Sequence, residues 1–317
     1  MIYPWQKTVW NTLQQARSCD HLPHALLFKG EAGCGNDDFM QTLAQGLLCL
    51  QPLPDGMPCS SCRSCQVFAA KAHPDYWIVE LQEDKQAIVI EQIRELNHFL
   101  GLSRSYSPRR IAVIQPAERM NTNAANSLLK SLEEPTANTH ILLLTEQAAS
   151  LLPTIRSRCQ GLRLPTPPKS LSLQWLKQHT LQHEPESLLQ LAHGRPLAAL
   201  ALDTVQTVSE HQQWLQHLGQ VLLKQANLVD ISSYWEKYDK NLLLDWQLDS
   251  LQKILKQTFF PSNREGLDEL KTIQANLSQS QAWAIYDALL DLRKLANHPL
   301  NPRAFIESML ILWHPEY

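Results

Sequence analysis

Residues 24–37 read HALLFKGEAGCGND, an apolar run followed by a glycine-rich segment. The apolar run, which ends at Phe28 shortly before Gly30, has the length of a buried strand that leads into a loop. A strand, a glycine-rich loop and a helix in this order form a nucleotide-binding layout. The segment therefore predicts an α/β domain of the P-loop kind.

The chain on both sides of this segment fits the same fold class. Helical spacing from Trp5 to Ala16 precedes it, and predicted strands and helices alternate after it. We expect strands at residues 76–80, 110–114 and 140–145, and helices at residues 90–100 and 122–132. This alternation is typical of a parallel sheet covered by helices.

A stiff break at Pro165-Thr166-Pro167-Pro168 is followed by a remainder with almost no strand signal. We expect an α/β domain over residues 1–165, a small helical lid domain over 166–205 and an all-helical bundle over 206–317. Apolar residues recur at helical spacing in the bundle, at Leu244, Leu248, Leu251, Leu255, Ile285, Leu289 and Leu292. Such stripes are typical of core faces, and the sequence leaves open whether part of them forms a subunit interface.

Composition excludes several classes of protein. Hydrophobic residues make up 44% of the 317 residues and charged residues 19%, as in a packed, helix-rich globular protein. A formal net charge of -3 argues against a protein whose main affinity is for nucleic-acid phosphates. The N-terminus lacks a secretory pattern, and no apolar run has the length of about 18 residues that a membrane span needs. We therefore expect a cytoplasmic protein.

The glycine-rich loop departs from a working P-loop. That motif needs glycines whose backbone N–H groups wrap the phosphates, a Lys that neutralises them, and a Ser or Thr for magnesium. The glycines are present at Gly30, Gly33 and Gly35, but Asn36 takes the lysine position and Asp37 the magnesium position. Glycine spacing alone is also typical of an ordinary tight turn. The context favours a degenerate P-loop.

The second nucleotide-binding element is missing as well. It should be an apolar strand that ends in Asp-Glu, where the Asp helps to hold magnesium and the Glu orients the attacking water. Here the strand from Ile111 to Ile114 ends in Gln115-Pro116. The sequence predicts that the chain does not hydrolyse ATP and carries no ATP cofactor. It leaves open weak nucleotide binding through backbone amides.

Four cysteines form the candidate metal site. Cys59, Cys62 and Cys65 are spaced by two residues each, and Cys49 lies nearby in the chain. The total of seven cysteines is odd, and no export signal accompanies them, so thiolate ligands of a metal are favoured over disulfides. Four thiolates can close a tetrahedral zinc site without an open position, which predicts structural zinc rather than catalytic zinc. The alternative is four unrelated thiols in a loop.

The segment Ser157-Arg158-Cys159 follows a helix-like stretch at residues 151–156. An arginine at such a tip can stabilise the negative charge that develops during phosphoryl transfer on another subunit. A single surface arginine is by itself nearly uninformative.

Taken in this order, the motifs resemble those of the bacterial clamp-loader family of AAA+ proteins. The resemblance spans nearly the whole chain, although the C-terminal bundle matches only in character. The segments that carry it are Leu128-Leu129-Lys130-Ser131-Leu132-Glu133-Glu134-Pro135 and Ser157-Arg158-Cys159, with His73-Pro74-Asp75-Tyr76 and Tyr3-Pro4-Trp5 in support.

The resemblance implies a subunit without motor activity, a stator, in a ring that opens the sliding clamp and loads it on primed DNA within the DNA polymerase III holoenzyme. Arg158 would act in trans as an arginine finger at the ATP site of an adjacent subunit. Leu197 stands where motor subunits place a phosphate-sensing Arg. The implied partners are the gamma/tau motor subunits, the delta subunit, the clamp and primed DNA, and residues 206–317 would form the oligomerising collar.

Two other functions are weighed against this one. A motor ATPase of the same family would need a Lys at Asn36, a Thr or Ser at Asp37, and acids at Gln115 and Pro116. A zinc-dependent nucleic-acid-binding module would need basic residues around its cysteines, yet Arg63 is the one cation between Cys59 and Cys65. Both are therefore disfavoured.

Overall fold

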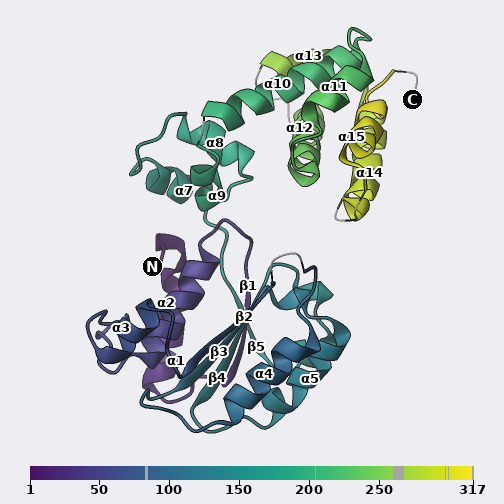
Figure 1. The fold of residues 1–317 in the computed structure, drawn as a ribbon. Helices are drawn as coiled ribbons and strands as arrows, with labels where there is room; N and C mark the ends of the chain where they lie inside the picture. The colour runs from purple at the N-terminus through teal and green to yellow at the C-terminus, as the bar shows by residue number, and fades with distance from the viewer. Residues whose placement is uncertain (83–84, 204, 260–267, 297, 299, 316–317) are drawn as a thin grey trace. The chain divides into compact units, whose positions relative to one another are not determined.

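The first unit of the chain is built on a parallel sheet of five strands, drawn from the computed structural model in Figure 1. The strands are β1 (Ala25–Lys29), β2 (Tyr76–Glu80), β3 (Arg110–Gln115), β4 (Thr139–Thr145) and β5 (Gln160–Arg163), in the order β2-β3-β4-β1-β5. The structure describes the chain except residues 83–84, 204, 260–267, 297, 299 and 316–317. The predicted parallel α/β sheet is confirmed.

Helices cover both faces of this sheet because alternate residues of the central strands are apolar on both sides. On β3, Ile111 and Val113 join one core cluster, and Ala112 and Ile114 join the other. The first cluster contains side chains of α1 (Lys7–Ser18) and α2 (Asn36–Leu48), and the second those of α4 (Ile90–Gly101) and α5 (Thr122–Glu133). The two helix layers can be followed on either side of the sheet in Figure 1.

One strand, β5, lies outside the predicted alternation. Its four residues are polar or small apart from Leu162, and most of them are exposed. It pairs with β1 alone at the edge of the sheet, where side chains have less core to contact. A short edge strand of this kind has no apolar run by which a sequence pattern can detect it.

Shorter helices complete this unit. They are η1 (Pro4–Gln6), α3 (Arg63–Ala69), η2 (Ala117–Arg119), η3 (Ala148–Ser150), α6 (Pro153–Arg156), α7 (Lys169–Leu176), α8 (Pro185–Leu191) and α9 (Pro196–Ala201). The helices α7, α8 and α9 pack against one another. The chain divides into two compact units, Met1–Ala201 and Leu202–Tyr317. A separate lid domain over residues 166–205 stays a prediction, and its residue 204 lies outside the described residues.

The second unit is helical throughout the part that the structure describes. Its helices are α10 (Val205–Leu222), α11 (Leu228–Trp235), α12 (Lys240–Phe259), α13 (Asp268–Asn276), α14 (Gln279–Leu295) and α15 (Pro302–Ile311). Its core surrounds three fully buried tryptophans, Trp214, Trp235 and Trp313. The apolar stripes predicted on α12 and α14 pack into this core. Residues 260–267 and 316–317 of the predicted third domain lie outside the described residues. None of the described helices is long and apolar enough to cross a membrane.

A buried histidine in β4 makes stability depend on pH. His140 is 6% exposed, and its Nδ1 lies 2.9 Å from the carbonyl oxygen of Pro23. Burial lowers the pKa of His140 to about 4, against the opposing effect of the bond to Pro23. The unfolded chain takes up a proton at His140 below its ordinary pKa of about 6.5, whereas the folded chain does not until the pH approaches 4. Stability therefore falls as the pH drops through this window.

We expect this residue to remove about 2 kcal/mol of stability between pH 7 and pH 5. Urea unfolding of the native chain and of His140→Asn at both pH values measures the effect. Between pH 7 and pH 5, the free energy of unfolding of the variant should fall by about 2 kcal/mol less than that of the native chain. An amide donor can replace Nδ1–H and does not titrate. His98→Asn, at an exposed position of α4, is the control and should behave like the native chain. Equal pH dependence in the native chain and His140→Asn would contradict the assignment.

Candidate functional site

The glycine-rich loop lies between β1 and α2 and requires its glycines. Gly33 and Gly35 adopt φ angles of +76° and +78°, in the left-handed region that residues with a Cβ avoid. The carbonyl oxygen of Gly33 accepts hydrogen bonds from the N–H groups of Leu197 and Ala198 at 3.0 and 3.3 Å. The start of α9, where Leu197 replaces the expected sensing arginine, therefore contacts this loop directly.

Asn36, at the lysine position, folds back into the loop instead of reaching out of it. Its Nδ2 donates a 2.8 Å hydrogen bond to the carbonyl oxygen of Glu31, and the residue is only 6% exposed. A Cβ added to Gly30 would lie 2.6 Å from this nitrogen, so Asn36 and Gly30 are in close contact. The amide side chain fills space inside the loop and brings no positive charge to it.

The two acids that begin α2 point to different partners. The Tyr3 hydroxyl donates a 2.6 Å hydrogen bond to Oδ2 of Asp38. Asp37 instead lines a cavity of about 480 Å³ beside the loop. Burial raises the pKa of Asp37, and the charges of Asp38 and Glu80 raise it further. Acids in the first turn also satisfy the positive end of the helix dipole, which in a working P-loop favours phosphate.

Carboxylates from other strands join Asp37 at this cavity. Glu80 ends β2 and Glu146 follows β4, and both line the cavity. Among the described residues that line it, none is Lys or Arg. Burial and then the charge of Glu118 raise the pKa of Glu146, against a lowering effect of Arg195. Sequence reasoning missed Glu80 and Glu146. The usable signal was that parallel strands bring their carboxyl ends to one edge of the sheet.

The end of β3 carries amide and proline in place of two carboxylates. Nε2 of Gln115 donates a 3.1 Å hydrogen bond to Oε1 of Glu80, and the following peptide bond to Pro116 is cis. Glu118 lies past the strand in η2, where its Oε1 accepts a 3.2 Å hydrogen bond from the N–H group of Glu146. No carboxylate therefore stands at the tip of β3, as the sequence indicated.

The N-terminal Tyr3-Pro4-Trp5 segment holds the outer side of the loop. Nε1 of Trp5 donates a 2.9 Å hydrogen bond to the carbonyl oxygen of Cys34, and Nε2 of Gln6 donates one of the same length to that of Gly35. The Trp5 ring stacks on Tyr3 and meets the Trp175 ring of α7 edge-on, with centroids 5.1 and 5.7 Å away. This motif therefore has a structural role at the degenerate loop.

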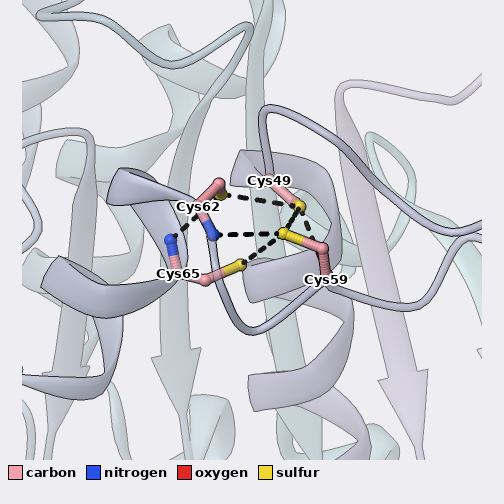
Figure 2. A group of neighbouring side chains, drawn as sticks. All are labelled: Cys49, Cys59, Cys62 and Cys65. Atoms are coloured by element: carbon pink, nitrogen blue, oxygen red, sulfur yellow. Dashed lines mark hydrogen bonds between the residues drawn. The ribbon is translucent and has the colours of Figure 1, made fainter.

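The four predicted metal ligands converge on one point (Figure 2). Cys49 follows the last residue of α2, Cys59 and Cys62 lie in the loop before α3, and Cys65 lies in the first turn of α3. All four sulfur atoms lie within 4.8 Å of one another. The segment folds back on α2 between Cys49 and Cys59, where Gly56 adopts a φ angle of +81°.

The spacing of the sulfur atoms fits a tetrahedral zinc ion. A Zn–S bond of about 2.3 Å places the ligand atoms of a regular tetrahedron about 3.8 Å apart. The sulfur of Cys49 lies 3.5 Å from that of Cys59 and 3.9 Å from that of Cys62, and the Cys59–Cys65 distance is 4.0 Å. The cluster can therefore hold one metal ion with four protein ligands.

Backbone donors around the cluster favour thiolates. The N–H groups of Cys59, Cys62 and Cys65 point at sulfur atoms of the preceding cysteines, at 3.4, 3.3 and 3.5 Å. The N–H groups of Cys62 and Ser61 lower the pKa of Cys59 to about 6. Burial raises the pKa of Cys49 and Cys65. A divalent cation would offset the cost of deprotonating these two buried thiols.

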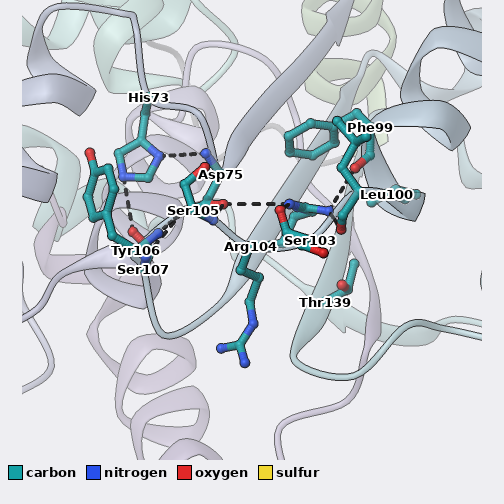
Figure 3. A network of polar contacts seen from close by, with 12 residues as sticks. His73, Asp75, Phe99, Leu100, Ser103, Arg104, Ser105, Tyr106, Ser107 and Thr139 are labelled. Carbon is teal, nitrogen blue, oxygen red and sulfur yellow. Dashed lines mark hydrogen bonds and ion pairs between the residues drawn. The ribbon is translucent and has the colours of Figure 1, made fainter.

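A buried polar network surrounds Asp75, in the His73-Pro74-Asp75-Tyr76 motif (Figure 3). Its carboxylate accepts hydrogen bonds from the N–H groups of Ser105, Tyr106 and Ser107, at 2.7, 3.2 and 3.1 Å, and lies 3.7 Å from Nη2 of Arg110. Burial would raise the pKa of Asp75, but the three N–H donors lower it overall. The motif therefore fixes the loop after α4, and pattern reasoning did not predict this role.

The same network reaches the cysteine cluster through His73. Its Nδ1 accepts a 3.0 Å hydrogen bond from the Asp75 N–H group, so the ring hydrogen is on Nε2, which lies 2.9 Å from the Ser64 hydroxyl. Ser64 sits between Cys62 and Cys65 and donates a 2.8 Å bond to the carbonyl oxygen of Leu48. Hydrogen bonds thus anchor the cysteine loop to the sheet domain.

Arg158 lies on the surface, just after α6. Its Nε donates a 2.6 Å hydrogen bond to Oε1 of Glu133 at the end of α5, and one Nη donates a 3.1 Å bond to the carbonyl oxygen of Thr154. The Arg158 side chain is 35% exposed and that of Glu133 is 47% exposed. The structure thus links Ser157-Arg158-Cys159 to the acidic end of the 128–135 motif, a contact that the sequence did not predict.

Comparisons with known proteins agree with this description. The family described as "DNA polymerase III, delta subunit" matches residues 5–168. The DNA polymerase III subunit delta' of Pseudomonas aeruginosa is 36% identical over 324 residues, which cover 98% of this chain and 97% of that protein. The proteins of the same name in Haemophilus influenzae and Bacillus subtilis are each 29% identical, over 98% and 96% of this chain and 95% and 94% of their own lengths. The chain therefore belongs to the family of DNA polymerase III delta' subunits.

Proposed function

We propose that this chain is the stator of a bacterial clamp loader, a subunit that helps to assemble the ring and load the sliding clamp without hydrolysing ATP. The observation that carries the proposal is the composition of the cavity beside the degenerate loop. Asp37, Glu80 and Glu146 line it, where a nucleotide would need cationic partners. The family of the chain and the motif order support the assignment to the clamp loader.

In this role the chain would contribute to ATP hydrolysis through Arg158, which would act at the ATP site of a neighbouring subunit. Exposed ion pairs contribute about 0 to 1 kcal/mol, so the bond to Glu133 holds Arg158 only weakly. A phosphate group that carries the negative charge of a transition state is a stronger partner for a guanidinium than an exposed carboxylate such as that of Glu133. Arg158 can therefore leave Glu133 when the neighbour's ATP site comes within reach.

The proposed cofactor and partners follow from the same reasoning. The four cysteines would hold structural zinc, because thiolates suit this ion and no ligand position is left open for chemistry. The partners would be the gamma/tau motor subunits and the delta subunit, with residues 206–317 as the collar. Contacts with the clamp and primed DNA would be made through the assembled complex, in the cytoplasm.

The absence of nucleotide binding is a direct test. We expect no saturable binding of a fluorescent ATP analogue up to about 1 mM, which corresponds to a binding free energy of about −4 kcal/mol. Fluorescence anisotropy with and without Mg²⁺ measures this, with a motor subunit of the same loader as the positive control. Asn36→Lys alone should not restore binding, because the carboxylates of the cavity remain. Micromolar affinity of the native chain would contradict the proposal.

A further inference from the structure

Buried oxygen atoms without partners lie in the cavity beside the loop and on Glu118, a neighbour of the lining residue Glu146. These atoms are Oδ1 of Asn36, Oε1 of Gln115, Oε2 of Glu118 and Oγ1 of Thr145. Asn36, Gln115 and Thr145 line the cavity. Glu118 does not line it, but its Oε1 accepts a hydrogen bond from the N–H group of Glu146, which does. Thr145 is 0% exposed and Asn36 is 6% exposed, so bulk water does not reach either residue freely. Buried polar atoms normally have partners, so these oxygen atoms call for a hydrogen-bond donor or a cation.

The unpartnered atoms are of one chemical kind. The free oxygens of Asn36 and Gln115 can only accept hydrogen bonds. The same holds for Glu118 when its carboxyl group is ionised, and the Thr145 hydroxyl can accept as well. The three carboxylates of Asp37, Glu80 and Glu146 add negative charge at the same place. Another hydrogen-bond acceptor cannot satisfy the oxygens of Asn36, Gln115 and ionised Glu118. A cation would satisfy the free oxygens and offset the mutual repulsion of the carboxylates.

We propose that this cavity binds a hydrated divalent cation of the hard class, such as Mg²⁺, without any nucleotide. The donors are carboxylate, amide and hydroxyl oxygens, which suit Mg²⁺, Ca²⁺ and Mn²⁺, whereas zinc prefers nitrogen and sulfur. The cavity, about 480 Å³, is large enough for an ion that keeps several of its water ligands. Arg195 opposes the carboxylates electrostatically, but its Nε is bonded to the carbonyl oxygen of Ala192 and it does not line the cavity.

Such an ion would connect segments that are distant in the sequence. Its ligands come from the loop after β1, the end of β2, the end of β3 and the end of β4. A working P-loop protein brings its metal ion together with the nucleotide, whereas here protein oxygens and water ligands would hold it. The degenerate loop would thereby be kept in one conformation in a subunit that never binds ATP.

The test is a Mn²⁺ titration of the zinc-loaded full chain, followed by the electron paramagnetic resonance signal of free Mn²⁺. Zinc loading keeps the cysteine cluster from taking up Mn²⁺. We expect one saturable Mn²⁺ per chain in the absence of ATP, displaced by Mg²⁺. Asp37→Asn combined with Glu146→Gln should weaken binding at least about tenfold. Glu91→Gln combined with Glu95→Gln, two exposed acids of α4, should leave it unchanged.

Thermal unfolding provides a second measurement on the same variants. Mg²⁺ should raise the melting temperature of the native chain and of the control, but not that of Asp37→Asn/Glu146→Gln, when ionic strength is matched with NaCl. Asp37→Asn and Glu146→Gln replace acids by amides of nearly the same shape, and an unchanged zinc content would show that the variant is folded. Absence of saturable Mn²⁺ binding, binding that requires ATP, or equal affinity in both double variants would overturn the proposal.

Discussion

Arg158→Ala is expected to slow ATP hydrolysis at the adjacent motor site by about a thousandfold, because arginine fingers contribute on the order of 10³ or more to phosphoryl transfer. The guanidinium would stabilise the charge on the transferring phosphate, and alanine supplies no donor in its place. The measurement is DNA- and clamp-stimulated ATP hydrolysis by motor subunits reconstituted with the native chain or the variant. In a ring with several ATP sites, the total rate would fall only by the share of that one site.

The chain offers a matched control for this experiment. Arg156 lies two positions earlier at the end of α6 and is also exposed, so Arg156→Ala removes the same charge from the same surface. It should leave hydrolysis unchanged. Arg158→Lys should remain impaired, because lysine cannot present the planar fork of donors. Gel filtration would show whether the complex with Arg158→Ala assembles normally. If it does, and hydrolysis and clamp loading stay at the native level, the trans role of Arg158 is refuted.

Much of the fold could be predicted because its elements have strong periodic signals. The strands β1, β3 and β4 are apolar runs, and α4 and α5 carry apolar residues at helical spacing, so burial alone identifies them. The clustering of the four cysteines was predictable for a different reason, because all four lie in one short segment with a spacing typical of metal ligands. The strand β5 lacks an apolar run, and only its pairing with β1 gives it a place in the sheet.

The rest of the site depends on contacts between distant segments. Glu80 and Glu146 reach the loop only through the register of β2, β3, β4 and β1, which a local pattern does not specify. Asp75 and Arg110 form a buried pair at 0% and 2% side-chain exposure, although charged residues in a polar stretch suggest surface positions. The direction of the Asn36 side chain depends on its rotamer and on the backbone conformation of the loop. These features depend on contacts that form only in the folded chain.

Cys65→Ser is expected to abolish stoichiometric zinc binding and to unfold the cysteine loop. Cys65 is 1% exposed, and a serine there would leave three thiolates and a weak oxygen ligand. Structural zinc supplies about 10 kcal/mol or more of apparent binding free energy in small zinc peptides, so the loss of such an ion would remove a large part of the support of residues 49–65. Metal analysis after dialysis should give one zinc per native chain and much less for the variant.

Hydrogen exchange should localise the damage and separate it from general unfolding. The amides of residues 59–65 should lose protection, whereas the sheet should keep it, because the packing of Leu43 and Leu47 of α2 against Ile111 and Val113 does not involve the cysteines. Cys19→Ser, at an exposed cysteine outside the cluster, should change neither zinc content nor exchange. Full zinc occupancy in Cys65→Ser would show that Cys65 is not a required ligand. Native protection of the cysteine loop after chelation would show that the Ser64 bonds to Leu48 and His73 suffice without metal.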